Sequence, residues 1–277
     1  RFRPGEVNPV NRNGGTRFPA TVGLLALVAG LSILFPLLSL VRGTQWASLP
    51  ALASAPENLT AALLSVTTAS LACAISTTLG FALALVLARA RGLLSSVLRA
   101  FVLVPLVLPP VVSGIALVLA YGRNSLLSPL MEAVGVRIVF STSAVVLAQV
   151  FVSLPFVVLT LESAFRARGF AEERAAASLG ARPRRVLTTV TLPRFAPSMV
   201  LAATLAFARS LGEFGATLTF AGSLAGTTRT LPLQIYLARE SDLAHAVGLS
   251  VLLAAFSLLT VSLVYARGPL TTEGAQQ

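Results

Sequence analysis

The sequence predicts an all-α membrane protein with six membrane-spanning helices. Of its 277 residues, 55% are hydrophobic and 11% are charged, whereas an ordinary soluble domain carries about 25% charged residues. The mean hydropathy is +0.84, and several runs of more than 20 residues contain no Asp, Glu, Arg or Lys. Because about 20 apolar residues cross the hydrocarbon core of a bilayer, these runs indicate spanning helices.

Five runs are long enough to span alone, and a sixth is predicted from two parts. The five are residues 18–41, 58–88, 100–122, 138–161 and 246–266. The run 195–208 is too short, so we expect it to continue to residue 222, with charges near the middle of the span. Residues 1–17 and 268–277 are polar tails that flank a membrane domain at 18–267. The first run is too long for the apolar segment of a cleavable signal peptide, so we expect it to remain.

The arginines predict the orientation of these helices, because the chain contains no lysine. If the N-terminus is cytoplasmic, fifteen arginines fall in the inner segments and five in the outer segments. The inner segments are 1–17, 89–99, 166–194 and residue 267. This positive-inside bias predicts that both termini are cytoplasmic. The net charge of +11 therefore follows the membrane, and we expect no nucleic acid partner.

The residues do not favour catalysis or self-contained pumping. A P-loop needs a lysine, which this chain lacks. Cys73 and His245 are the sole cysteine and histidine, so no intramolecular disulfide and no zinc cluster is expected. We expect Cys73 to be a packing residue and His245 an interfacial one. Two alternatives stay open: a membrane enzyme that uses Glu162 and Glu213 on a lipid, and an ATP-independent channel or carrier.

The long inner loop at 166–194 predicts two short helices held under the membrane. Residues 170–179 are strong helix formers, with two acids in the first turn, where the helix dipole favours them. Gly180 stands in the usual place of a C-terminal glycine. Pro183 then begins a second helix, and Pro193 is predicted to end it. The spacing allows two roles for this loop. It is either a hairpin that rests on anionic lipid or a docking element for a cytoplasmic partner.

The loop resembles the EAA motif of ABC importer permeases. In that motif, Glu-Ala-Ala is followed after three residues by Gly, and after nine more by an aliphatic residue, one residue and Leu-Pro. This chain matches the pattern except that Arg174 occupies the glutamate position. The resemblance implies a coupling helix seated in a separate ATPase subunit. The residues concerned are Glu172, Glu173, Arg174, Ala175, Ala176, Gly180, Leu192 and Pro193.

Two further stretches are similar to the oxyanion permeases of this family, and the resemblance covers about residues 58 to 267. Residues 103–122 are similar to their proline-rich third helix. Residues 209–236 look most like the molybdate branch, with the sulfate branch close, so the expected cargo is molybdate or tungstate and the alternative is sulfate or thiosulfate. The resemblance implies a type I ABC importer permease fold in the bacterial cell membrane.

The same resemblance implies the partners. They are a second copy of the chain, cytoplasmic ATPase subunits that bind the ATP and Mg, and an extracytoplasmic molybdate-binding protein. Membrane lipid surrounds the permease. We expect no cofactor, no metal and no catalytic residue in the chain itself.

The third and fifth helices are expected to line the translocation path. Arg209 and Glu213 are four residues apart and can pair, and a buried charge is costly unless paired. The pair is either structural or part of a gate. Prolines interrupt the third helix, glycines allow close approach of helices, and threonine hydroxyls can face a path. The expected path residues are Pro109, Pro110, Arg209, Gly212, Glu213, Gly215, Thr217 and Thr219.

Overall fold

Every regular element that the computed structural model describes is a helix. The structure describes residues 19–125, 127–133, 135 and 137–267. The chain divides into two units, Arg1–Thr44 and Gln45–Gln277. The first unit contains α1 (Ala20–Arg42), a helix of 23 residues none of which is buried. An apolar helix of this length suits the hydrocarbon core, as the sequence predicts for the first span.

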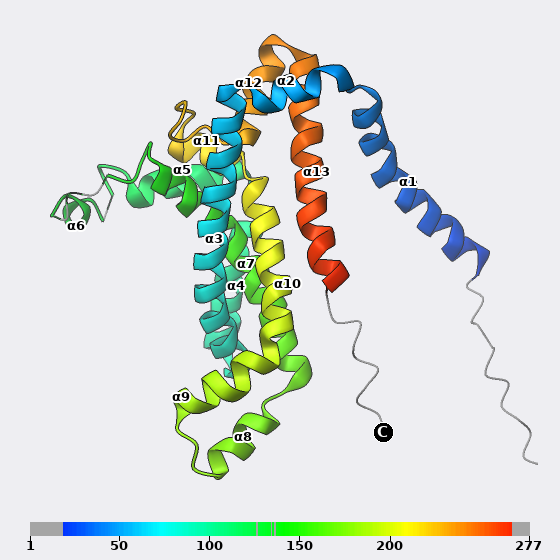
Figure 1. Cartoon of the computed structure of the whole chain (residues 1–277). Helices are drawn as coiled ribbons and strands as arrows, with labels where there is room; N and C mark the ends of the chain where they lie inside the picture. Colours follow the sequence, from blue (N-terminus) through cyan, green and yellow to red (C-terminus); the bar gives the residue numbers. More distant parts are fainter. Residues whose placement is uncertain (1–18, 126, 134, 136, 268–277) are drawn as a thin grey trace, which may run out of the picture. The chain divides into compact units, whose positions relative to one another are not determined.

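Three long helices form the centre of the second unit. They are α3 (Pro56–Arg89), α7 (Thr142–Arg168) and α10 (Leu192–Leu211), and they lie side by side (Figure 1). A fourth helix, α13 (Leu243–Arg267), packs against α10. In the described part of the whole chain, five helices are long and apolar enough to cross a membrane, or six if one bent pair counts as a span. The predicted helical membrane protein is therefore confirmed.

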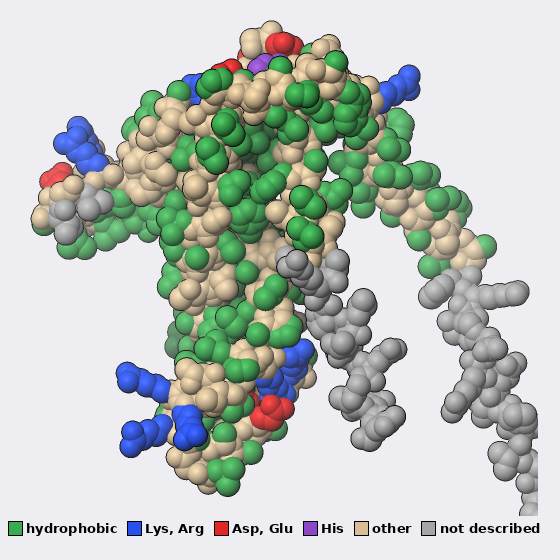
Figure 2. Space-filling model, in the orientation of Figure 1, with side chains coloured by type: hydrophobic (Ala, Val, Ile, Leu, Met, Phe, Trp, Pro, Cys, Tyr) green, Lys and Arg blue, Asp and Glu red, His purple; other side chains and the backbone are tan. Residues whose placement is uncertain are grey.

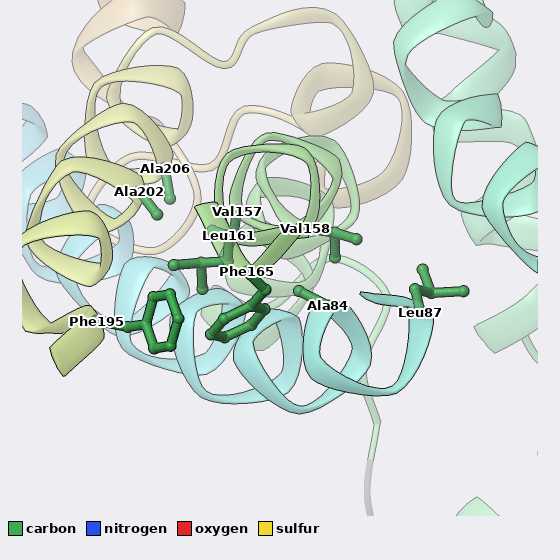
Figure 3. Close-up of a cluster of buried hydrophobic side chains, with 9 residues drawn as sticks. All are labelled: Ala84, Leu87, Val157, Val158, Leu161, Phe165, Phe195, Ala202 and Ala206. Carbon is green, nitrogen blue, oxygen red and sulfur yellow. The ribbon is translucent and has the colours of Figure 1, made fainter. Parts of the chain in front are cut away.

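A cluster of buried hydrophobic side chains joins the three central helices (Figure 3). Its members are Ala84 and Leu87 from α3, Val157, Val158, Leu161 and Phe165 from α7, and Phe195, Ala202 and Ala206 from α10. The rings of Phe165 and Phe195 meet edge to face with centroids 4.5 Å apart, a geometry that aromatic pairs prefer. Gly80 lets α3 approach α7 closely, because a Cβ there would lie 2.6 Å from Val157 Cγ1.

The third predicted span is not a straight helix. Its residues form α4 (Leu93–Val107) and α5 (Pro110–Tyr121), which are bent by 117° relative to each other. Leu108 and Pro109 between them have extended backbones. A proline lacks the N–H and restricts the residue before it to extended conformations, so consecutive prolines stop the helix. The predicted break at these prolines is confirmed, and the bent pair starts seven residues earlier than the run predicted at 100–122.

A helical hairpin projects from the end of the bundle where α7 stops and α10 begins (Figure 1). Its arms are α8 (Ala171–Ser178) and α9 (Pro183–Val186). Gly180 has a φ of 82°, the left-handed conformation of a C-terminal glycine. The N–H of Ala181 donates to the carbonyl of Ala176, which closes the end of α8. Both predicted short helices and the bend between them are confirmed.

Pro193 does not end the second arm of the hairpin, so that prediction is wrong. α9 continues through the π-helical residues Leu187–Thr191 into α10, and the whole run Pro183–Leu211 is apolar enough to span. Proline is tolerated in the first turn of a helix, and Pro193 is the second residue of α10. The wider π-helical turn bonds residues five apart and carries the chain past the proline.

The sixth span also ends earlier than predicted. α10 stops at Leu211, and a separate helix, α11 (Gly215–Ala221), follows residues 212–214. Arg209 lies in the last turn of α10 and Glu213 lies beyond it. The prediction of charges near the middle of a span at 195–222 is therefore wrong, because the helical ladder stops between the two charges.

Short helices complete the second unit at and near the end opposite the hairpin (Figure 1). They are η1 (Trp46–Ser48), α2 (Leu49–Ser54), α6 (Ser128–Ala133) and α12 (Leu231–Ser241). α12 packs against α3 and α13, and α2 packs against α13. At Gly248 of α13, a Cβ would lie 2.6 Å from Leu52 Cδ1 of α2, so α2 packs closely on α13 at this glycine.

α5 and α11 pack against each other through positions that have no side chain. A Cβ at Gly215 would lie 2.5 Å from Cβ of Pro110, and a Cβ at Gly114 would lie 2.4 Å from Cβ of Thr219. Small residues permit such close approach between helices in membranes. The sequence left packing and bending open as roles for these glycines, and the geometry at Gly215 is that of a packing contact.

We expect Gly215→Ala to destabilise the protein by about 1–3 kcal/mol, the usual cost of overpacking a close contact. The proline ring that faces Gly215 is rigid and cannot move aside alone. Gly212→Ala is the matched control, because a Cβ there would have one neighbour within 4 Å, the Ala208 carbonyl oxygen at 3.7 Å. Thermal unfolding of both purified variants in detergent measures the difference. Equal melting temperatures would contradict the packing contact.

Candidate functional site

The hairpin presents a basic surface with one apolar side chain at its tip. Its arginines are exposed and gather at this end of the bundle, as Figure 2 shows. Leu179, at the end of α8, is 89% exposed. Ala175 and Ala177 are also exposed, and Ala176 is half-buried. A projecting leucine beside small residues is typical of an anchor that enters a groove on a partner.

The two acids of the hairpin have different environments. The side chain of Glu173 is 5% exposed and lies 3.5 Å from Arg194 Nη1, whereas that of Glu172 is 61% exposed and lies 3.3 Å from Arg194 Nη2. Glu173 therefore ties α8 to the start of α10, and Glu172 remains accessible at the surface. Arg174, at the glutamate position of the motif, is exposed. The structure thus separates the two acids that the sequence could not distinguish.

Two arginines close the base of the hairpin. Arg168 Nη1 donates to the carbonyl of Arg194 at 2.7 Å, and Arg194 Nη2 donates to the carbonyl of Arg168 at 3.0 Å. Both guanidinium groups lie against the ring of Phe195, at 5.8 and 5.5 Å from its centroid. Leu192 and Pro193 belong to this base and not to the exposed tip. This role of Arg168 was not predicted from the sequence, although a basic residue in the last turn of a helix is a known signal.

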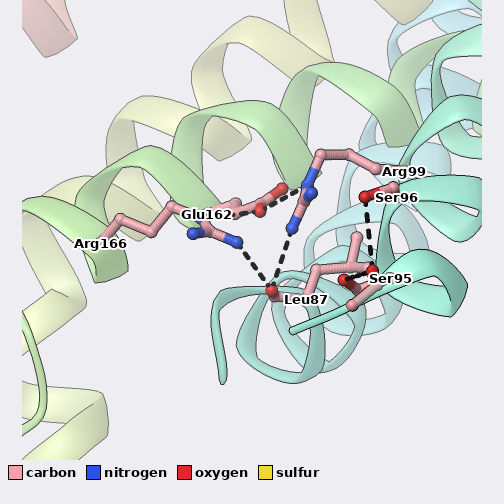
Figure 4. Close-up of polar contacts among 7 residues, drawn as sticks. Leu87, Ser95, Ser96, Arg99, Glu162 and Arg166 are labelled. Atoms are coloured by element: carbon pink, nitrogen blue, oxygen red, sulfur yellow. Dashed lines mark hydrogen bonds and ion pairs between the residues drawn. The ribbon is translucent and has the colours of Figure 1, made fainter. Parts of the chain in front are cut away.

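A buried carboxylate organises the neighbouring end of α3 (Figure 4). Glu162 Oε1 accepts from Arg99 Nε at 2.8 Å and from Arg166 Nε at 2.9 Å. The same two arginines donate to the carbonyl of Leu87 at 3.2 and 3.0 Å. That carbonyl is in the last turn of α3, where helix geometry leaves carbonyls without partners. The network joins α3, α4 and α7, a structural role that the sequence did not predict for Glu162.

The expected pair between Arg209 and Glu213 is present at the break between α10 and α11. Arg209 Nη2 lies 2.7 Å from Glu213 Oε2, and the Glu213 side chain is 2% exposed. Glu213 Oε1 also accepts the N–H of Ala216 at 2.9 Å. One carboxylate therefore neutralises the arginine at the end of one helix and caps the first turn of the next.

The other expected path residues surround this break. Pro109 and Pro110 lie where α4 turns into α5, and Pro110 packs on Gly215. Thr219 Oγ1 donates to the carbonyl of Gly215 at 2.9 Å. Thr217 is fully buried, and its hydroxyl has no hydrogen-bond partner among the described residues. Gly212 is exposed, and a Cβ there would meet only the Ala208 carbonyl oxygen, at 3.7 Å.

Cys73 and His245 have the ordinary surroundings that the sequence predicts. Cys73 is half-buried, with its Sγ 3.2 Å from the carbonyl of Ala203, so it packs between α3 and α10. His245 Nε2 lies 3.2 Å from Asn58 Nδ2 at the end of the bundle opposite the hairpin. Within the described ranges, no three His, Cys, Asp or Glu side chains are grouped closely enough to hold a metal ion.

Comparisons with known proteins agree with the geometry. Residues 76–268 match the family model described as a binding-protein-dependent transport system inner membrane component. The molybdenum transport system permease protein ModB of Mycobacterium tuberculosis is 51% identical over 258 residues, which cover 93% of this chain and 98% of the relative. ModB of Escherichia coli is 40% identical, covering 72% and 90%. The sulfate transport system permease protein CysW of Synechococcus elongatus is 38% identical, covering 68% and 66%.

Solved structures show the same fold. A bacterial ABC transporter involved in the import of the acidic polysaccharide alginate aligns with a TM-score of 0.70, covering 92% of this chain and 96% of that one at 15% identity. The bacterial alginate ABC transporter in complex with an alginate pentasaccharide-bound periplasmic protein aligns with a TM-score of 0.68 at 14% identity, covering 88% and 92%. The fold and hairpin together define a multi-pass membrane component of the ABC importer permease type. The chain belongs to the family of binding-protein-dependent transport system inner membrane components.

We expect Glu213→Ala to destabilise the protein more than Glu213→Gln. The glutamine oxygen still accepts the N–H of Ala216, so it retains the helix cap, which contributes about 1 kcal/mol. Thermal unfolding of the purified variants in detergent measures the order of stability. Glu240→Gln is the control, because this exposed side chain has no ion pair within the described residues. If Ala and Gln at position 213 lower the melting temperature equally, the capping role is refuted.

Proposed function

We propose that the chain is the permease subunit of an ATP-driven importer for molybdate, with tungstate as a second cargo. The observation that carries the proposal is 51% identity to a molybdenum transport permease over nearly the full length of both chains. The projecting hairpin, with its left-handed Gly180, supports the coupling function. Sulfate or thiosulfate remains the second candidate, because a sulfate permease is 38% identical over 192 residues.

The proposed orientation places the hairpin in the cytoplasm. The described arginines near the hairpin include Arg89, Arg91, Arg99 and seven within 166–194, whereas four lie toward the opposite side in the second unit. Positive residues concentrate on the cytoplasmic side of membrane proteins. The α2 and α12 end then faces outward, where an extracytoplasmic binding protein would deliver the anion.

The proposed energy source is a separate ATPase that binds ATP and Mg, because the chain has no lysine to form a P-loop. Leu179 and the exposed part of α8 enter a groove on this ATPase. Movement of α8 reaches α7 and α10 through Arg168, Arg194 and Phe195, which close the hairpin base. ATP binding thus turns the path outward, and hydrolysis returns it to the inward-facing state.

The proposed working unit contains two copies of the chain around a two-fold axis. Closed two-fold symmetry is the commonest arrangement of homo-oligomers. The path is lined in part by α5 and α11, whose breaks meet at Pro110 and Gly215. Arg209 is neutralised by Glu213, so the path holds the anion weakly and releases it. Selection of the anion is then left to the binding protein, as the complex of the alginate transporter with its periplasmic protein suggests.

The decisive experiment measures ATPase rate in proteoliposomes that contain this permease, its ATPase and its binding protein. We expect molybdate and tungstate to stimulate hydrolysis several-fold and sulfate or thiosulfate to have little effect. Stimulation by sulfate alone would reject the molybdate assignment. Flux through the chain without any ATPase would reject the importer as a whole.

A matched pair of variants tests the hairpin within the same experiment. Leu179→Asp places a charge where we expect an apolar anchor, so it should abolish stimulation and co-purification with the ATPase. Leu179→Met keeps an apolar side chain of similar volume and should retain both. If Leu179→Asp couples normally, the tip is not the docking anchor.

A further inference from the structure

A pocket of about 740 Å³ lies behind the hairpin, at the end of α3. Its volume is in the range of about 300–1,000 Å³ that is typical of ligand sites. The walls come from the end of α3, from α8 and from the continuous α9–α10 run. Arg174 and Ala177 of α8 line the pocket but Leu179 does not, so the apolar anchor proposed to contact the ATPase lies outside it.

Three of the four charged residues that line this pocket are arginines. Arg89, Arg91 and Arg174 line it, and none of the three has a carboxylate partner within the described residues. The Arg89 guanidinium lies 4.6 Å from the centroid of the Phe170 ring, which holds it at the pocket wall. Three guanidinium groups without counter-ions favour an anionic ligand, and arginine suits phosphate in particular.

One acid also lines the pocket and sets the kind of anion that fits. Both oxygens of Glu173 are buried and accept no hydrogen bond of acceptable geometry, although Arg194 lies 3.5 Å away. Arg194 balances the charge of this carboxylate, but its lone pairs remain able to accept from a donor. A ligand that carries both a phosphate and hydroxyl donors satisfies the arginines and Glu173 together.

Most of the remaining lining is apolar and belongs to the ends of helices that are long and apolar enough to span a membrane. Leu85 and Ala88 belong to the last turns of the spanning helix α3, and Val186 and Leu187 begin the spanning run that continues into α10. A site with an apolar wall toward the bilayer and arginines at its rim matches an amphipathic ligand. Basic pockets between helices on the cytoplasmic side are known to bind anionic lipid headgroups.

We propose that this pocket binds an anionic phospholipid with a hydroxyl-bearing headgroup, of the phosphatidylglycerol kind. Its phosphate contacts Arg89, Arg91 and Arg174, a headgroup hydroxyl donates to Glu173, and an acyl chain lies on the apolar wall. The lipid then bridges α3 and the coupling hairpin. This site goes beyond the transport function proposed above and does not depend on which anion is carried.

Native mass spectrometry of the permease–ATPase complex tests the proposal. The complex is offered phosphatidylglycerol and phosphatidylethanolamine with identical acyl chains, and the retained lipids are counted. We expect the wild type to retain phosphatidylglycerol preferentially. The triple variant R89Q/R91Q/R174Q should lose affinity on the order of 100-fold, since each basic residue contributes about fivefold to binding of anionic lipid. Inorganic phosphate at millimolar concentration should not displace the lipid.

The matched control is R182Q/R184Q/R185Q, which removes the same charge from exposed hairpin positions that do not line the pocket. An equal loss of lipid in this control would overturn the site, and so would equal retention of the two lipids by the wild type. A photoreactive phosphatidylglycerol tests the wild type without any substitution. Its cross-links should fall within 85–91 and 170–191, and cross-links elsewhere alone would overturn the proposal. Lipid retention requires no transport, so its failure is distinguishable from failure of the importer function.

Discussion

The hydrocarbon core of the bilayer offers no partner to a broken backbone or an unpaired charge, and this constraint governs the fold. Non-helical backbone at membrane depth is tolerated where protein or cavity water covers it. Among the described residues, the helices are interrupted at 108–109 and 212–214, and the helices that follow these interruptions pack against each other through Pro110 and Gly215. Glu213 adds a buried carboxylate that neutralises Arg209 and caps α11. The two interrupted helices therefore depend on one another.

The opposite end of the bundle meets the same constraint with arginine side chains. Arg99 and Arg166 satisfy the carbonyl of Leu87 at the end of α3, and Glu162 pairs with both and offsets one of their two charges. Arg168 and Arg194 satisfy each other's backbone carbonyls where the hairpin leaves the bundle. These arginines are thus part of the structure of the helix ends, in addition to marking the side of the membrane.

The sequence predicted the features that depend on composition and local spacing. Charge-free runs identified the spans, and Gly180 and Pro183 placed the bend and the second arm of the hairpin. The 117° turn between α4 and α5 was not predicted, because hydropathy reports the length of an apolar run and not its direction. α10 ends at Leu211 with Gly212 as its C-cap residue, an end that the hydropathy of the run did not reveal. The packing of Gly215 on Pro110 joins residues distant along the chain, so no local pattern contains it.

Some contacts of the site residues could be predicted from local spacing, and others could not. The pairing of Arg209 with Glu213 follows from a spacing of four residues, although the helix ends between them. The sequence does not show which of the adjacent acids Glu172 and Glu173 is buried. The buried one, Glu173, pairs with Arg194, which is distant along the chain. The partners of Glu162 come from α4 and α7, so their convergence required the fold.

The central claim is that the hairpin is cytoplasmic and the α12 end is external, since coupling, delivery and the lipid site all rest on it. Single cysteines at Leu179→Cys and Glu240→Cys, each in a Cys73→Ala background, can be labelled with a membrane-impermeant maleimide. We expect the Glu240→Cys variant to react in intact spheroplasts and the Leu179→Cys variant to react only in inside-out vesicles. Labelling of position 179 from outside would contradict the orientation and every proposal built on it.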